Sequence, residues 1–138
     1  MAATVYLTRR VTFSASHRLH SPELDEAENK AIFGKCNNLH GHGHNYSLEV
    51  TVHGTVDPTT GMVMNLTDLK HAMETEILDR VDHKHLNLDV PIFEEIIPTA
   101  ENMAVVFWHL LEKVLPNGFL YEVRLQETEN NVAVYRGE

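Results

Sequence analysis

Alternating apolar and polar positions mark the first long element of the chain, over residues 5–19. Its odd positions are mostly apolar and its even positions mostly polar, which is the period of two that a half-buried strand shows. The same alternation recurs over residues 44–53, where the apolar positions are Tyr46, Leu48, Val50 and Val52. We therefore predict two long early strands, each with one buried face.

Two further strands are predicted near the carboxyl end of the chain. Residues 119–127 and 131–135 both alternate, and the turn-prone Glu129, Asn130 and Asn131 join them. The polar residues 21–35, with Pro22 near the start and Gly34 near the end, predict a long loop with room for one helical turn.

Between the two pairs of strands the apolar period changes to that of helices. Asn65 can cap a first helix, whose apolar stripe of Leu66, Leu69, Met73 and Ile77 extends to about Arg80. Thr99 can cap a second helix that ends near Gly118 and is apolar almost all round, so we expect it to be buried on more than one side.

The resulting order is ββααββ. Two early strands, two helices and two late strands predict an α+β fold with a four-stranded antiparallel sheet covered by two helices on one face. The length of 138 residues suits one compact domain, so we expect residues 1–138 to form a single domain.

Composition and charge narrow the possible partners. Hydrophobic residues make up 43% of the chain and charged residues 22%, as in ordinary folded proteins. The formal charge of -9, with 11 scattered Lys and Arg, argues against generic binding to nucleic acid or to acidic membranes. Cys36 is the single cysteine, no secretory pattern precedes the first strand, and no apolar stretch is long enough to span a bilayer, so we expect a cytoplasmic protein.

Histidine is the unusual residue, with ten in the chain. His42 and His44 are two residues apart at the entry of a strand and project to one side, and Gly43 between them leaves room for a ligand. If the two early strands pair, His17 joins them from the apolar face of the first strand. Three neutral imidazoles with an open fourth position are typical of a catalytic zinc site, although a lone histidine is more often a packed core residue. The side chains of His20, His40, His53, His71 and His109 are expected to lie outside the site.

Cys36 allows three interpretations. As a fourth metal ligand it would make the site closed and structural. Held near the metal but unbound, with cationic neighbours such as Lys35, it would be an acidified thiol able to act as a base. A lone cysteine can also simply be a small buried apolar residue.

Two other groups carry possible chemistry. Asp82 and His83 could form a carboxylate–imidazole pair for proton transfer, although two adjacent loop residues are weak evidence. Glu127 lies on the apolar face of its strand, where a carboxylate needs a partner with fixed donors. The paired N–H groups of a heterocycle such as a pterin would satisfy it, and so would water or an arginine at the end of the strand.

Six motifs together resemble the 6-pyruvoyltetrahydropterin synthase family, nearly from end to end of the chain. They are Phe13-Ser-Ala-Ser-His17-Arg-Leu, Phe33-Gly-Lys-Cys36-Asn-Asn, Gly41-His-Gly-His-Asn-Tyr46, Gly61-Met-Val-Met-Asn65-Leu, Val81-Asp82-His83-Lys and Glu127-Thr-Glu-Asn-Asn131. The resemblance implies a tunnelling fold, in which ββααββ subunits join their sheets into a trimeric barrel and two trimers stack into a homo-hexamer. It also implies a zinc-dependent lyase of tetrahydrobiopterin biosynthesis that converts 7,8-dihydroneopterin triphosphate to 6-pyruvoyltetrahydropterin, with elimination of triphosphate and internal redox tautomerisation.

The resemblance also implies roles for individual residues. His17, His42 and His44 match zinc ligands, Cys36 the general base, and Asp82 with His83 a proton relay that reaches in from a neighbouring subunit. Glu127 matches the pterin anchor, and Thr99 and Glu101 match secondary pterin contacts, with Ala100 where relatives often carry a hydroxyl.

Two rival functions stay open at this point. The related 6-carboxytetrahydropterin synthase shares the zinc triad but resembles a shorter spacing than that between Cys36 and His42. A zinc-stabilised binding module without activity would use Cys36 as a fourth ligand and would unfold without its metal. The residues that would bind the triphosphate stay open, with Lys35, Arg18 and Lys84 as candidates. The residues up to Thr12 resemble a site for phosphorylation by a kinase, but the interior of a strand explains them better.

Overall fold

The computed structural model describes residues 2–138 and contains one five-stranded sheet in the order β3-β1-β2-β4-β5. Its strands are β1 (Thr4–His17), β2 (His42–Thr55), β3 (Lys84–His85), β4 (Leu120–Thr128) and β5 (Asn131–Tyr135). All neighbours pair antiparallel except β3, which runs parallel to β1. The α+β class is confirmed, but the predicted count of four strands is wrong, because a two-residue strand is too short to show an alternation.

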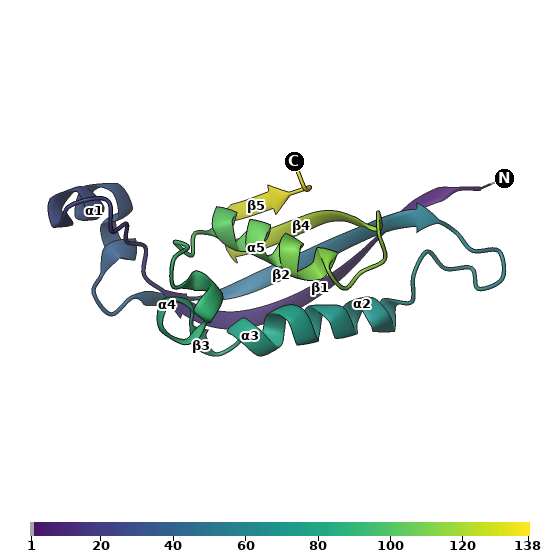
Figure 1. Cartoon of the computed structure of the whole chain (residues 1–138), viewed down its shortest axis with the longest axis horizontal. Coiled ribbons are helices and arrows are strands. Elements are labelled where there is room, and N and C mark those ends of the chain that lie inside the picture. Colours follow the sequence, from purple (N-terminus) through teal and green to yellow (C-terminus); the bar gives the residue numbers. More distant parts are fainter. Residues whose placement is uncertain (1) are drawn as a thin grey trace.

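The β1–β2 pair is the long central ribbon of the molecule (Figure 1). Its register pairs Phe13 with Tyr46, and these two rings stack with centroids 4.8 Å apart. The apolar alternation of both strands lies on the helix-covered face, whereas the opposite face carries polar pairs such as Thr8 with Thr51. The sequence period therefore gave the buried face of both strands correctly.

The helices cover one face of this sheet. The first predicted helix is a continuous run of α2 (Leu66–Met73), the π-helical segment η2 (Glu74–Leu78) and α3 (Asp79–Val81), and Asn65 caps it by accepting from the amide of Thr67. The second is α5 (Ala100–Glu112), whose Thr99 cap accepts from the amide of Asn102. Both helices contribute buried residues to the core that includes Phe13 and Tyr46.

Residues 21–35 contain more helix than the sequence predicted. The helix α1 (Glu26–Phe33) begins with a capping box, in which Asp25 and Glu28 bond each other's backbone amides, and η1 (Gly34–Asn37) follows it. The fully buried side chain of Asn29 holds the preceding turn through the backbone of Ser21. Figure 1 shows α1 at one end of the molecule, away from α2 and α5.

Two short elements, α4 (Leu86–Asp89) and η3 (Pro91–Phe93), connect β3 to α5. Within residues 2–138, no helix has the length and apolar character needed to cross a membrane.

Candidate metal centre and adjoining pocket

Three imidazoles meet where β1 ends and β2 begins. The register pairs His17 directly with His42, and His44 with Ala15, so that antiparallel pairing brings the three rings onto one face. Each ring offers one nitrogen, and these atoms all lie within 4.8 Å of one another. The convergence predicted from the alternation is thus present in the structure, and Cys36 is not part of this group.

The hydrogen bonds of His17 determine which of its nitrogens faces the group. Nδ1 lies 2.7 Å from the carbonyl oxygen of Pro98, which can only accept, so Nδ1 carries the proton. Nε2 is therefore the unprotonated nitrogen, and its lone pair is available to bind a metal. Among residues 2–138 neither this atom nor Nε2 of His44 has a hydrogen-bond partner, although both are buried.

Burial keeps the imidazoles of His17 and His42 neutral. It lowers the pKa of His17 to about 4, and His42, His44 and His85 lower it further, whereas the Pro98 hydrogen bond opposes the shift. The pKa of His42 is lowered by burial and by His44, with the Glu127 carboxylate opposing. Neutral imidazole is the form that binds a metal, so His17 and His42 are in that form at neutral pH.

The donor set fits zinc. Three imidazole nitrogens converge, and two of them are buried without a hydrogen-bond partner in the described part of the chain. Such a set suits a borderline metal such as Zn²⁺ better than Mg²⁺ or Ca²⁺, which prefer oxygen. Three protein ligands also leave a fourth position for substrate or water. A hydrogen bond from the distal nitrogen of a ligating histidine to a backbone carbonyl, as His17 makes to Pro98, is the usual way such a ring is oriented.

Cys36 lies in η1, half-buried, with its carbonyl accepting from the amide of Leu19 just beyond β1. Burial raises the pKa of the Cys36 thiol, and the nearby Glu127 carboxylate raises it further. In the metal-free protein the surroundings of Cys36 therefore oppose ionisation. A cation bound by the triad would act in the opposite direction.

A cavity of about 670 Å³ adjoins the triad. Thr99, Glu101 and Glu127, the three residues that the resemblance assigns to pterin binding, all line it. Oε2 of Glu127 lies 4.0 Å from Nε2 of His17, so this carboxylate joins the cavity to the metal-binding group. Ala100, Leu19 and Phe33 also line the cavity and give it apolar surface beside the carboxylates.

The Asp82–His83 pair is formed in the structure. Oδ1 of Asp82 lies 2.9 Å from Nδ1 of His83 and also accepts from the amide of Ser14, while the amide of His83 donates to the Ser14 carbonyl. His83 has a positive φ of 62°, which is uncommon outside glycine, and its side chain is 82% exposed. The backbone of Ser14 thus holds a strained residue whose ring faces solvent.

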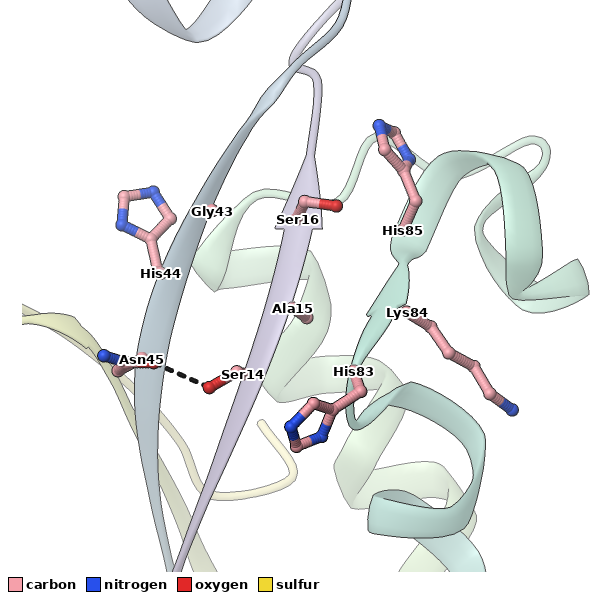
Figure 2. A pocket seen from close by; sticks show the side chains of 9 residues that line it. All are labelled: Ser14, Ala15, Ser16, Gly43, His44, Asn45, His83, Lys84 and His85. Atoms are coloured by element: carbon pink, nitrogen blue, oxygen red, sulfur yellow. Dashed lines mark hydrogen bonds between the residues drawn. The ribbon is translucent and has the colours of Figure 1, made fainter.

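This pair is not part of the group of three converging histidines in its own chain. It borders a hollow of about 390 Å³ that His44 of the triad also lines, and Figure 2 shows His44 on β2 and His83 next to β3, with β1 between them. Gly43 lines the same hollow, and a Cβ there would have only ordinary contacts with Ala15 and Ser16. The room that Gly43 leaves therefore lies in this hollow.

Of the basic residues considered for triphosphate, Lys84 lies at this hollow, but its ammonium group donates to the carbonyl of Asp79 and points away (Figure 2). His85, which no sequence pattern singled out, also lines the hollow beside Lys84. The only signal was a histidine two residues beyond His83, because a two-residue strand has no readable period.

Sequence and structure comparisons both relate this chain to one family of known proteins. Residues 6–138 match the sequence profile of the family described as 6-pyruvoyl tetrahydropterin synthase. The human 6-pyruvoyl tetrahydrobiopterin synthase is 58% identical over 132 residues, which cover 96% of this chain and 91% of the relative. The protein of the same name from Dictyostelium discoideum is 51% identical over 138 residues and the full length of both chains. The solved structure of Caenorhabditis elegans 6-pyruvoyl tetrahydropterin synthase superposes with a TM-score of 0.94 at 47% identity, covering 99% of this chain and 97% of that one.

Proposed function

This chain belongs to the 6-pyruvoyl tetrahydropterin synthase family and is an enzyme, and we propose that it is a zinc-dependent lyase acting on 7,8-dihydroneopterin triphosphate. The proposed products are 6-pyruvoyltetrahydropterin and triphosphate, formed by elimination and internal redox tautomerisation in tetrahydrobiopterin synthesis. The observation that carries the proposal is the 4.0 Å approach of Glu127, in the 670 Å³ cavity, to the buried His17 of the triad.

The cavity would bind the pterin ring. Glu127 would accept two hydrogen bonds from the amino-pyrimidine edge of the pterin, which presents a pair of N–H groups much as a guanidinium does. Thr99 and Glu101, at the start of α5, would contact the same ring from the side of the helix. A pterin held in this way would extend its hydroxylated side chain toward His17, His42 and His44.

The triad would hold Zn²⁺ through its three imidazoles. When bound, this ion would supply Lewis-acid polarisation of the side-chain hydroxyls and so acidify the neighbouring C–H bonds. The Nδ1 hydrogen bond of His17 to Pro98 would keep its ring oriented for that role.

Cys36 would be the general base that removes a carbon-bound proton. Its backbone is fixed beside the end of β1 by the hydrogen bond to Leu19, and its thiol shares the electrostatic environment of Glu127. The high pKa in the metal-free protein suits a base that ionises only when the site carries a cation. The absence of Cys36 from the histidine group argues against the interpretation as a fourth ligand.

Asp82 and His83 would act on the substrate bound to a neighbouring copy. Their ring and carboxylate form a hydrogen-bonded pair, and the ring faces solvent. The left-handed backbone of His83 costs free energy, and no contact of the ring in the part of the chain that the structure describes accounts for that cost. We propose a homo-hexamer in the cytoplasm, built from two trimers whose sheets join into a barrel, in which this exposed pair completes the next site.

The test is direct. Zinc-loaded protein incubated with 7,8-dihydroneopterin triphosphate should release triphosphate and give a product with the mass of 6-pyruvoyltetrahydropterin. A product with the mass of 6-carboxytetrahydropterin would reassign the reaction to the related enzyme. No turnover, together with unfolding on removal of zinc, would leave only a zinc-stabilised binding module.

A further inference from the structure

A fourth imidazole, His85, lies beside the triad without an assigned role. Its Cα is paired with that of Ser16, the residue that precedes His17. It is near enough to contribute to the lowered pKa of His17, yet it is not one of the three histidines whose nitrogens converge. Its Nδ1 is buried and has no hydrogen-bond partner among residues 2–138. A buried nitrogen without a hydrogen-bond partner costs free energy, so the buried position of this ring needs an explanation.

The segment that carries His85 grips the backbone on both sides of His17. His85 pairs with Ser16 on one side, and on the other side the side-chain amide of Asn87 bonds Arg18 twice. Asn87 accepts from the Arg18 amide at 2.8 Å and donates to the Arg18 carbonyl at 2.9 Å. Residues 84–87, which we name the 84–87 clip, therefore fix the position of the first histidine of the triad.

The ring of His85 extends from the clip to the segment that carries the second histidine. Gly41 immediately precedes His42 and has a φ of 77°, a left-handed conformation that favours glycine. A Cβ on Gly41 would lie 2.6 Å from the carbonyl oxygen of His17 and 3.0 Å from Nε2 of His85. The backbone of Gly41 thus occupies a slot between the His17 main chain and the His85 ring.

We propose that His85 is a positioning residue of the metal centre, whose ring braces the Gly41 turn and so fixes the His42 imidazole relative to that of His17. One element then controls two of the three ligands, His17 through the backbone bonds of the clip and His42 through the packed ring. Without the ring, the backbone of Gly41 loses its packing contact on one side, and the orientation of the His42 imidazole becomes less defined. The proposal rests on the proposed function in one respect, that the triad binds Zn²⁺.

The experiment measures metal binding, not turnover. Apo-protein is titrated with Zn²⁺ against a chromophoric chelator, and the ligand-field absorption of the Co²⁺-substituted protein reports the geometry of the site. His85→Ala should weaken Zn²⁺ binding by about tenfold to a hundredfold, the usual effect of removing a group that orients a ligand, and should alter the Co²⁺ spectrum. His85→Phe restores a flat ring and should bind Zn²⁺ within about threefold of the wild type, because its bracing is by packing.

The control is His71→Ala, which removes an exposed imidazole from α2 and should change neither measurement. Wild-type affinity and an unchanged Co²⁺ spectrum in His85→Ala would overturn the proposal, as would a His85→Phe variant that binds as weakly as His85→Ala. If circular dichroism shows that His85→Ala does not fold, His85→Ser carries the same comparison with the same expected loss. Turnover of 7,8-dihydroneopterin triphosphate by the wild type is assayed separately, so that a failure of the proposed reaction is distinguished from a failure of the positioning role.

Discussion

Nδ1 of His17 lies 2.7 Å from the carbonyl oxygen of Pro98, so a residue 81 positions away determines the tautomer of this histidine. The bond directs Nε2 toward His42 and His44, and within residues 2–138 this nitrogen has no hydrogen-bond partner. Pro98 lies just before the Thr99 cap of α5, and Thr99 lines the adjoining cavity. The start of one helix therefore orients a ring of the candidate metal site and forms part of the wall of the proposed pterin pocket.

Zinc content tests the triad. The wild-type protein should bind one Zn²⁺ per chain, and His42→Ala should lose nearly all of it, because two imidazoles do not form a stable tetrahedral site. Elemental analysis of purified, dialysed protein measures this, with His71→Ala as the matched exposed control. Stoichiometric zinc in His42→Ala would remove His42 from the ligand set.

Cys36→Ala separates a base from a ligand. If Cys36 removes a proton, this variant should keep its zinc and its pterin affinity while turnover falls by about two to four orders of magnitude. Bound zinc and product formation are measured on the same preparation. Loss of both zinc and turnover would make Cys36 a ligand, and retention of both would make it a packing residue.

Glu127→Gln tests the pterin anchor. Replacing the carboxylate with an amide removes a charge and one of two acceptors, so affinity for the pterin should fall by about tenfold to a hundredfold, as for loss of a hydrogen bond to a charged group. Binding of the non-phosphorylated neopterin, followed by fluorescence or calorimetry, isolates this contact. Glu129→Gln, at an exposed turn two residues away, is the control, and equal effects of the two substitutions would contradict a specific anchor.

Acid should destabilise the metal-free protein through His17. Its pKa is about 4 in the folded chain and about 6.5 when unfolded, so between these values the unfolded chain holds a proton that the folded chain lacks. The free energy of unfolding should therefore fall as the pH drops from about 6.5 toward about 4, by up to about 3 kcal/mol from this group. The lowered pKa of His42 acts in the same direction. Urea unfolding of zinc-free protein across this range, compared with His17→Gln, measures it; identical pH slopes for the two proteins would refute the assignment.

Mixed oligomers test whether sites are shared between subunits. Sedimentation should give a hexamer, and a stable monomer at micromolar concentration would end the shared-site proposal. Cys36→Ala and His83→Ala should each be nearly inactive alone. Co-expressed, they should regain a measurable fraction of turnover, because some sites then combine an intact Cys36 with an intact His83 from a neighbour. No recovery in verified mixed oligomers would place all the reacting groups on one chain.

The sequence predicted the parts of this site that depend on strand period. His17, His42 and His44 converge because alternation assigns a face to each residue and antiparallel pairing aligns the strands, so period and order were sufficient. The strand β3 was missed because two residues cannot show a period, and with it the position of His85 beside the triad was missed. The helix α1 could have been anticipated from Asp25 and Glu28, which form a capping box, but its weakly apolar sequence hid it. The placement of Asp82 and His83 depends on the tertiary contact with Ser14, which no local pattern encodes.

In the proposed hexamer, the hydrogen bonds of Ser14 would limit how subunits can join. Asp82 and His83 occupy the outward-facing amide and carbonyl of Ser14, and β3 covers the next residues up to Ser16. The open edge of β1 therefore ends before Ser14, and a strand from another copy can add only to the stretch that starts at Thr4. The Asp82–His83 pair thus limits how far a strand from another copy can pair along β1. A copy paired up to that limit would lie next to the exposed imidazole of His83.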